Sequence, residues 1–172
     1  MKTLFMRTTA VAAALAMLSA PAWASGEPTV KEINVNAELN SLTDSNARAY
    51  YPDVAHDILE KIVDKLPMTN DPQGYVVTVN IQRMSLDGDT MLPDSREFNQ
   101  IEGVMSILAP DTNANTESYP IRVYARSADH AVPAGYAVIE PSSDDFYQAM
   151  IDGFATEVAD KAPDVMREAS SK

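Results

Sequence analysis

The sequence contains no cysteine, and this absence excludes several structures and chemistries at once. The chain cannot form a disulfide, cannot use a thiol as a nucleophile, and cannot supply the cysteine ligands that are typical of structural zinc sites. It also offers no cysteine to which a lipid anchor could be attached. We therefore expect a protein without a lipid anchor, whose fold depends on its hydrophobic core.

Basic residues are few as well, because 13 Lys and Arg stand against 25 Asp and Glu and give a net charge of −12. Such a charge repels nucleic acid and anionic lipid, so we expect neither as a partner. Histidine is limited to His56 and His130. Neither lies in a metal-binding spacing such as HExxH, so we predict that both are solvated and that the chain needs no metal or other cofactor.

Familiar catalytic motifs are missing too. The sequence has no GxSxG nucleophile motif, no phosphate-binding glycine loop and no dinucleotide-binding fingerprint. Carboxylates are abundant, so a pair at the separation used by glycosidases is expected by chance and would need a surrounding cleft to act. These absences favour a binding protein over an enzyme, and a carboxylate-based hydrolase stays open as an alternative.

One acidic segment invites a calcium interpretation. Asp87, Asp89 and Asp94 lie close together around Gly88. In an EF-hand counted from Asp87, however, the fifth, sixth and twelfth positions would need an acid, a glycine and a glutamate, and here they are hydrophobic. We therefore interpret the segment as a solvated turn, with a looser calcium site on Asp87, Asp89 and Asp94 as the alternative.

Residues 1–24 have the parts of a secretory signal peptide. Lys2 and Arg7 make a positive start, residues 10–18 are apolar, and residues 22–24 end the segment with two small residues around a tryptophan. The apolar run is roughly half of the about 20 residues that a membrane span needs. We predict cleavage between Ala24 and Ser25, with export to the periplasm or beyond the cell.

The rest of the chain predicts one α+β domain over residues 25–165, followed by a frayed tail over residues 166–172. Alternating polar and apolar residues predict strands over residues 30–39, 75–84, 100–108 and 119–126. Apolar residues three and four apart predict helices over residues 46–66 and from Ser142 or Ser143 to Pro163, with residues 136–139 extended before the second helix. Pro52 leaves two possibilities for the first helix: the helix begins at Pro52, or a preceding turn is kinked. We expect a four-stranded, mainly antiparallel sheet with both helices on one face, in the order β-α-β-β-β-α.

The predicted outer face of that sheet is not uniformly polar. Five residues from the third and fourth strands would form a candidate partner surface there: Arg122, Tyr124, Arg126, Val104 and Leu108. Interfaces favour such a mixture of arginine, aromatic and aliphatic side chains. The plainer interpretation is cross-strand packing together with an ion pair between an arginine and Glu102.

Residues 139–147, with the sequence IEPSSDDFY, resemble a family of small, uncharacterised secreted proteins of Rhodobacter-type bacteria. That resemblance implies a fold and no activity, because the motif is a helix start followed by two aromatic residues. The order of the predicted elements also resembles that of the lipopolysaccharide-assembly lipoprotein and related small envelope lipoproteins, which is a likeness of topology alone. This chain lacks the lipidated cysteine of those proteins.

Together these observations predict a soluble, periplasmic, non-enzymatic binding or accessory protein of the cell envelope. Its partner would be an envelope protein or a small ligand. The alternatives are a carboxylate-based periplasmic hydrolase and a calcium-dependent binding protein. The sequence leaves open whether the chain is a monomer or a homodimer.

Overall fold

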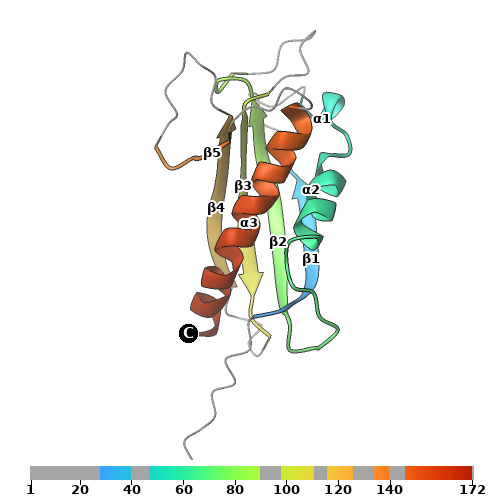
Figure 1. The fold of residues 1–172 in the computed structure, drawn as a ribbon, viewed down its shortest axis with the longest axis vertical. Coiled ribbons are helices and arrows are strands. Elements are labelled where there is room, and N and C mark those ends of the chain that lie inside the picture. Colours follow the sequence, from blue (N-terminus) through green and yellow to red (C-terminus); the bar gives the residue numbers. More distant parts are fainter. Residues whose placement is uncertain are drawn as a thin grey trace, which may run out of the picture.

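The computed structural model describes residues 28–39, 47–89, 98–110, 116–125, 134–139 and 146–171. The fold is α+β, as predicted, and its helices pack on one face of a mixed five-stranded sheet (Figure 1). The predicted signal peptide lies outside the described residues. The elements are β1 (Val30–Ala37), α1 (Ala47–Tyr50), α2 (Val54–Val63), β2 (Tyr75–Ser85), β3 (Gln100–Leu108), β4 (Thr116–Ala125), β5 (Ala137–Ile139) and α3 (Phe146–Ser170).

The strands lie side by side in sequence order, from β1 at one edge to β5 at the other. β2, β3 and β4 are antiparallel, whereas β1 runs parallel to β2 and β5 runs parallel to β4. A parallel pair needs a crossover, which α1 and α2 help to supply between β1 and β2. The sheet has one strand more than the four that we predicted. The additional strand is β5, whose three residues are too few to show a periodic pattern in the sequence.

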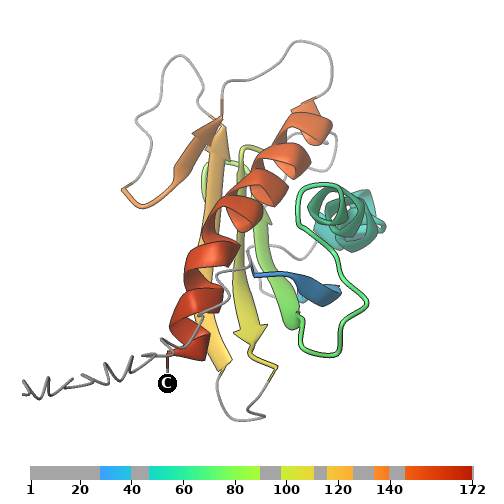
Figure 2. The same cartoon turned by 60° about the horizontal axis from the view of Figure 1, so that its bottom comes forward.

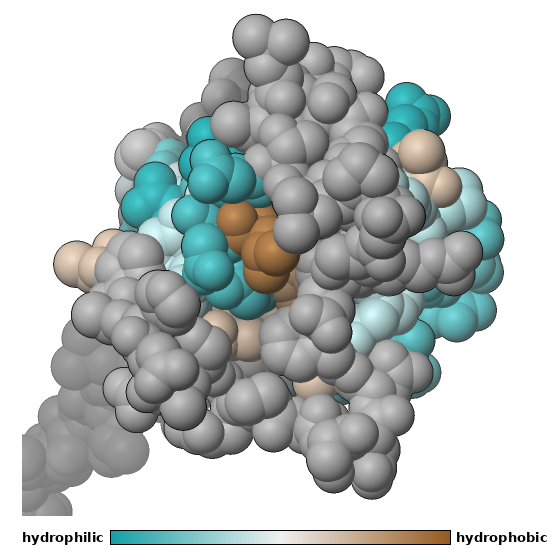
Figure 3. All heavy atoms as spheres, turned by 90° about the horizontal axis from the view of Figure 1, so that it is seen from above, coloured by the Kyte–Doolittle hydropathy of each residue, from teal (hydrophilic) through white to brown (hydrophobic). Residues whose placement is uncertain are grey.

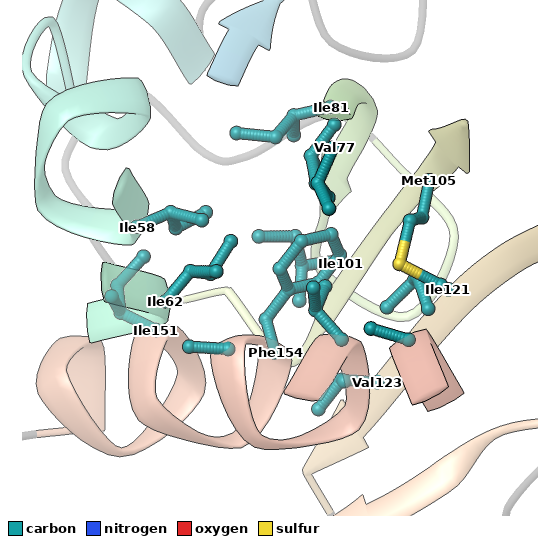
Figure 4. Close-up of a cluster of buried hydrophobic side chains, with 14 of the residues drawn as sticks. Ile58, Ile62, Val77, Ile81, Ile101, Met105, Ile121, Val123, Ile151 and Phe154 are labelled. Carbon is teal, nitrogen blue, oxygen red and sulfur yellow. The ribbon is translucent and has the colours of Figure 1, made fainter. Parts of the chain in front are cut away.

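The core fills the space between the sheet and the helices. Side chains from the inner face of β2, β3 and β4 meet Ile58 and Ile62 of α2 and Ile151 and Phe154 of α3, and all are fully buried (Figure 4). Gly103 of β3 leaves room for this contact, because a Cβ there would lie 3.0 Å from Cζ of Phe154 and 2.7 Å from the carbonyl oxygen of Asn80. α3 thus packs tightly across the middle of the sheet, as its course in Figure 2 shows.

Two helices occupy the segment predicted as a helix over residues 46–66, and they are separated at Pro52, where the sequence indicated either a helix start or a kinked turn. α1 ends at Tyr50 and α2 begins at Val54, with Pro52 between them. A proline inside a helix removes a backbone donor and its ring collides with the carbonyl four residues earlier. The helix therefore stops before Pro52 and restarts after it, with the predicted apolar stripe preserved on α2.

The predicted end of the last helix is wrong. α3 continues through Pro163 to Ser170, so most of the segment that we expected to be a frayed tail is helical. An interior proline costs about 3 kcal/mol, but Val165, Met166 and Ala169 beyond it are buried against the core. Their removal from water offsets the cost of the proline. None of the helices in the described part of the chain is long and apolar enough to span a membrane.

A candidate interaction surface on the outer face of the sheet

The outer face of the sheet is the side turned away from the helices, and none of the described helices covers it (Figures 1 and 2). The pairing register arranges its side chains in rows across the strands. From the lower end in Figure 1 to the upper end, the rows are Glu32–Val76–Leu108–Thr116, Asn34–Thr78–Ser106–Ser118, Asn36–Asn80–Val104–Pro120, Arg83–Glu102–Arg122 and Ser85–Gln100–Tyr124–Val138.

A β-bulge in β2 determines which side chains reach the upper rows. The register shifts between Ile81 and Arg83, where Gln82 is the additional residue. Without the bulge, strict alternation after Ile81 would turn Arg83 toward the core and Met84 away from it. The bulge reverses this, so Met84 is fully buried and Arg83 pairs with Glu102 of β3 on the outer face. Bulges commonly re-aim a side chain in this way.

The three lower rows consist mostly of small polar side chains. Neighbouring residues bond to each other: the hydroxyls of Ser106 and Ser118 lie 3.0 Å apart, and Nδ2 of Asn36 donates to Oδ1 of Asn80 at 3.1 Å. The register places Val104 beside Pro120 and Leu108 beside Val76. The two aliphatic residues of the predicted surface are therefore on the predicted face, half-buried and in different rows.

The fourth row is an ion-pair row centred on Glu102. Oε1 of Glu102 lies 3.3 Å from Nη1 of Arg83, and Oε2 lies 3.8 Å from Nε of Arg122. Oε1 also accepts hydrogen bonds from Nε2 of Gln100 at 2.6 Å and from the hydroxyl of Tyr136 at 2.8 Å. We call these five residues the Glu102 cluster. The arginine–Glu102 ion pair that the sequence suggested is confirmed, and a second arginine joins it.

The arginines of the Glu102 cluster remain accessible while its carboxylate does not. The side chains of Arg83 and Arg122 are 40% and 44% exposed, against 19% for Glu102. Burial is the main cause that raises the pKa of Tyr136, and its hydrogen bond to Glu102 adds to the effect. Tyr136 thus stays a neutral donor to the carboxylate, and the cluster presents guanidinium groups to solvent.

The prediction that Tyr124 forms part of an exposed partner surface needs correction. Tyr124 lies on the outer face, but it is only 5% exposed and so supports the surface instead of presenting a ring to a partner. Its hydroxyl donates to Oδ1 of Asp87 at 2.7 Å, and its ring meets that of Tyr136 edge-on with centroids 6.0 Å apart. The hydrogen bond to Asp87, and then burial, raises the pKa of Tyr124. Arg126 lies outside the described residues.

The acidic segment after β2 forms a tight turn. Asp87 and Gly88 both have positive φ angles, 50° and 85°, and Leu86 and Asp89 exchange backbone hydrogen bonds across them. Positive φ at both central residues is typical of a two-residue type I′ hairpin turn. Asn99 holds the turn, because its Nδ2 donates to Oδ1 of Asp87 at 2.5 Å and its Oδ1 accepts from the Asp87 N–H at 2.7 Å.

The described residues do not bring the calcium candidates into a metal site. No group of three or more His, Asp or Glu side chains in this part of the chain could hold a metal ion. Asp94 and His130 lie outside the described residues. His56 is exposed on α2, where its Nε2 lies 3.2 Å from Oε1 of Glu60. Seen from the upper end, the described surface is hydrophilic around a small apolar area (Figure 3).

Sequence reasoning missed three members of the Glu102 cluster: Arg83, Gln100 and Tyr136. A signal for Arg83 was present, because the polar pair at positions 82 and 83 interrupts the alternation of β2 before Met84. Gln100 and Tyr136 gave no comparable signal, since their contacts depend on the register of β3 and on the course of the chain near β5. No protein-family model matches the chain, and no curated protein matches it either.

Proposed function

We propose that this chain is an exported, non-enzymatic binding protein of the bacterial cell envelope, and that it holds an acidic segment of a partner protein against the outer face of its sheet. The observation that supports this proposal is the Glu102 cluster, which fixes two accessible arginines on a sheet face that none of the described helices covers. The signal-peptide pattern of residues 1–24 supports the location.

The geometry of the arginines suits a carboxylate partner. A guanidinium has five N–H donors, and the described contacts to Glu102 use few of them. Because Glu102 already orients both side chains, less rotamer freedom is lost when a partner carboxylate binds.

The shape of the face favours a protein over a small ligand. Small-molecule sites are concave and enclose most of their ligand, whereas the lower rows present a broad array of serine, threonine and asparagine side chains. Hydrogen bonds from such side chains, mixed with Val104 and Leu108, match the composition of a protein interface with a polar rim.

Export is tested first. The protein recovered from a periplasmic fraction should begin at Ser25 and should show no tryptophan fluorescence, because Trp23 is the only tryptophan in the sequence. N-terminal sequencing and a fluorescence spectrum measure both. A protein that keeps residues 1–24 and stays in the cytoplasm would contradict the proposed location.

The surface is tested by crosslinking in intact cells. A photoreactive amino acid at Val104, on the outer face, should capture an envelope protein, whereas one at Val63, which is 41% exposed on α2, should not. Arg122→Ser should reduce the Val104 adduct. Arg167→Ser is the matched control, because Arg167 also pairs with a carboxylate but lies on α3. Equal adducts from Val104 and Val63, or no effect of Arg122→Ser, would contradict the proposal.

A further inference from the structure

The two outer strands of the sheet differ in how their free edges are protected. At β1, the backbone N–H of Val30 donates to the carbonyl of Pro67 at 2.9 Å, and the N–H of Thr69 donates to the carbonyl of Val30 at 2.8 Å. The chain after α2 therefore covers the start of this edge, and charged Lys31 and Glu32 follow. Charges and covering segments are the usual means of blocking an edge strand.

At the opposite side of the sheet, β4 is protected, whereas none of the described strands pairs with the outer edge of β5. β5 pairs with residues Val123 to Ala125 of β4 only, and below this point Pro120 interrupts the β4 edge with a residue that has no N–H. β5 contains no proline and no charged residue. None of the described segments lies beyond it (Figures 1 and 2).

A groove runs alongside β5. It has a volume of about 400 Å³ and lies between β5 and α3, with Ala137 and Gly153 among the small residues that line it. Asp152 and Glu157 of α3 are its charged lining residues. Val138 of β5, at 45% exposed, is one of the few large hydrophobic side chains on the described surface.

We propose that an extended segment of a partner protein, bearing lysine or arginine side chains, adds to the free edge of β5 and places alternate side chains in the β5–α3 groove. In this mode of recognition, main-chain hydrogen bonds to the edge strand supply affinity, and the groove beside the strand selects every second side chain. The site shares Val138 with the fifth row of the outer face, but its charged lining residues do not belong to the Glu102 cluster, so the variants Gly153→Leu and Arg122→Ser test the two proposals separately.

The carboxylates that line the β5–α3 groove are the reason for proposing a basic partner segment. Asp152 is 53% exposed and lies 2.9 Å from Lys65, and Glu157 lies 3.8 Å from Lys161. These lysines come from outside the groove lining, so both carboxylates can still accept bonds from a cation beside β5. The net charge of −12 attracts a basic segment over a longer range.

The same charges argue against a second copy of this chain at the site. Two copies joined through their β5 edges would form an isologous contact that brings Asp152 and Glu157 of one copy close to those of the other. Like charges facing each other across an interface disfavour association. A basic segment of another protein avoids this repulsion.

Selection from a library of random linear peptides displayed on phage tests the proposal on the full-length exported protein. Enriched peptides should share lysine or arginine at alternating positions. Their affinity should fall about tenfold or more for Gly153→Leu, which fills the groove, and should be unchanged for Asp160→Leu on an exposed part of α3. No enrichment, or equal binding to Gly153→Leu, would overturn the proposal.

A second measurement on the unaltered protein covers the case in which Gly153→Leu does not fold. Methylating alternate backbone nitrogens of an enriched peptide removes its main-chain donors, so its affinity should fall about tenfold or more. Unchanged affinity would overturn the pairing with β5. Sedimentation that shows a dimer, dissociated by Gly153→Leu, would instead assign the edge to a second copy and would also overturn the proposal.

Discussion

The two faces of the sheet share the same strands and the same alternation of side chains, yet they are stabilised in different ways. On the inner face, residues such as Val79, Met105 and Ile121 are fully buried beneath α2 and α3. On the outer face, Thr78 and Ser106 are half-buried in rows that no described helix covers. Stability comes from removal of apolar surface on the inner side and from local hydrogen bonds on the outer side.

The upper end of the outer face departs from this division. Ser85, Asn99 and Gln100 are buried polar residues, and they bond to one another or to charged neighbours. Buried polar groups are stable only while their partners remain, because an unpaired one keeps the cost of its lost hydration. Substitutions here should therefore resemble those in the core more than those in the lower rows.

The largest effect is expected from the inner face. Phe154→Ala should destabilise the protein by about 3–5 kcal/mol, because it removes a fully buried ring and leaves a cavity between α3 and β3. Urea unfolding followed by circular dichroism measures the change. A loss below about 1 kcal/mol would show that α3 does not pack on the sheet through this residue.

The next effect concerns the Glu102 cluster. Glu102→Gln keeps the shape of the side chain but removes the charge that faces Arg83 and Arg122, and it should cost about 1–3 kcal/mol. Glu32→Gln is the control, because Glu32 is exposed on the same face and accepts from Asn34 at 2.9 Å. It should change stability by less than about 0.5 kcal/mol. If both variants lost the same free energy of unfolding, the upper rows would be no more sensitive to substitution than the lower rows.

Much of the difference between the inner and outer faces of the sheet could be predicted from the sequence. Alternation in residues 75–81 and 100–108 predicted which side chains face the helices, because burial on one face leaves a period of two. The spacing of apolar residues by three and four likewise predicted the last helix, and Phe154 is one of these residues and is fully buried. These signals are local and repeat along one element, so the pattern alone suffices to predict them.

The features that the sequence did not predict depend on contacts between distant segments. The bulge at Gln82 is defined only by the register with β3, and β5 is a strand only because β4 lies beside it. α3 passes Pro163 because residues beyond it are buried. The Glu102 cluster also depends on contacts between distant segments, since β2, β3, β4 and the segment before β5 each supply a member.

Alkaline pH should weaken both sides of the sheet through their tyrosines. The pKa values of Tyr124 and Tyr136 on the outer face are raised, and burial and a hydrogen bond to Asp57 raise that of Tyr147 beside α2. The folded state holds these protons more tightly than the unfolded chain, whose tyrosine pKa is about 10. Their stabilisation is complete below about pH 10 and is lost as the pH rises toward the folded pKa values.

Tyrosinate absorbance and unfolding followed over the same pH range measure this effect. Of the seven tyrosines in the sequence, these three should ionise only above pH 10 and together with unfolding. Tyr147→Phe should remove one such group and leave the other two. Simple titration of all seven near pH 10 in a folded protein would contradict the hydrogen bonds to Asp87, Glu102 and Asp57.

The smallest effect is expected in the lower rows. Ser118→Ala removes one of two exposed hydroxyls that lie 3.0 Å apart, and it should change the free energy of unfolding by less than about 0.5 kcal/mol. Water replaces the lost partner at Ser106, so no polar group is left unsatisfied. A loss above about 1 kcal/mol would mean that this row is buried in the isolated protein. A face that is already covered could not serve as the partner surface, so this minor substitution also tests the proposed function.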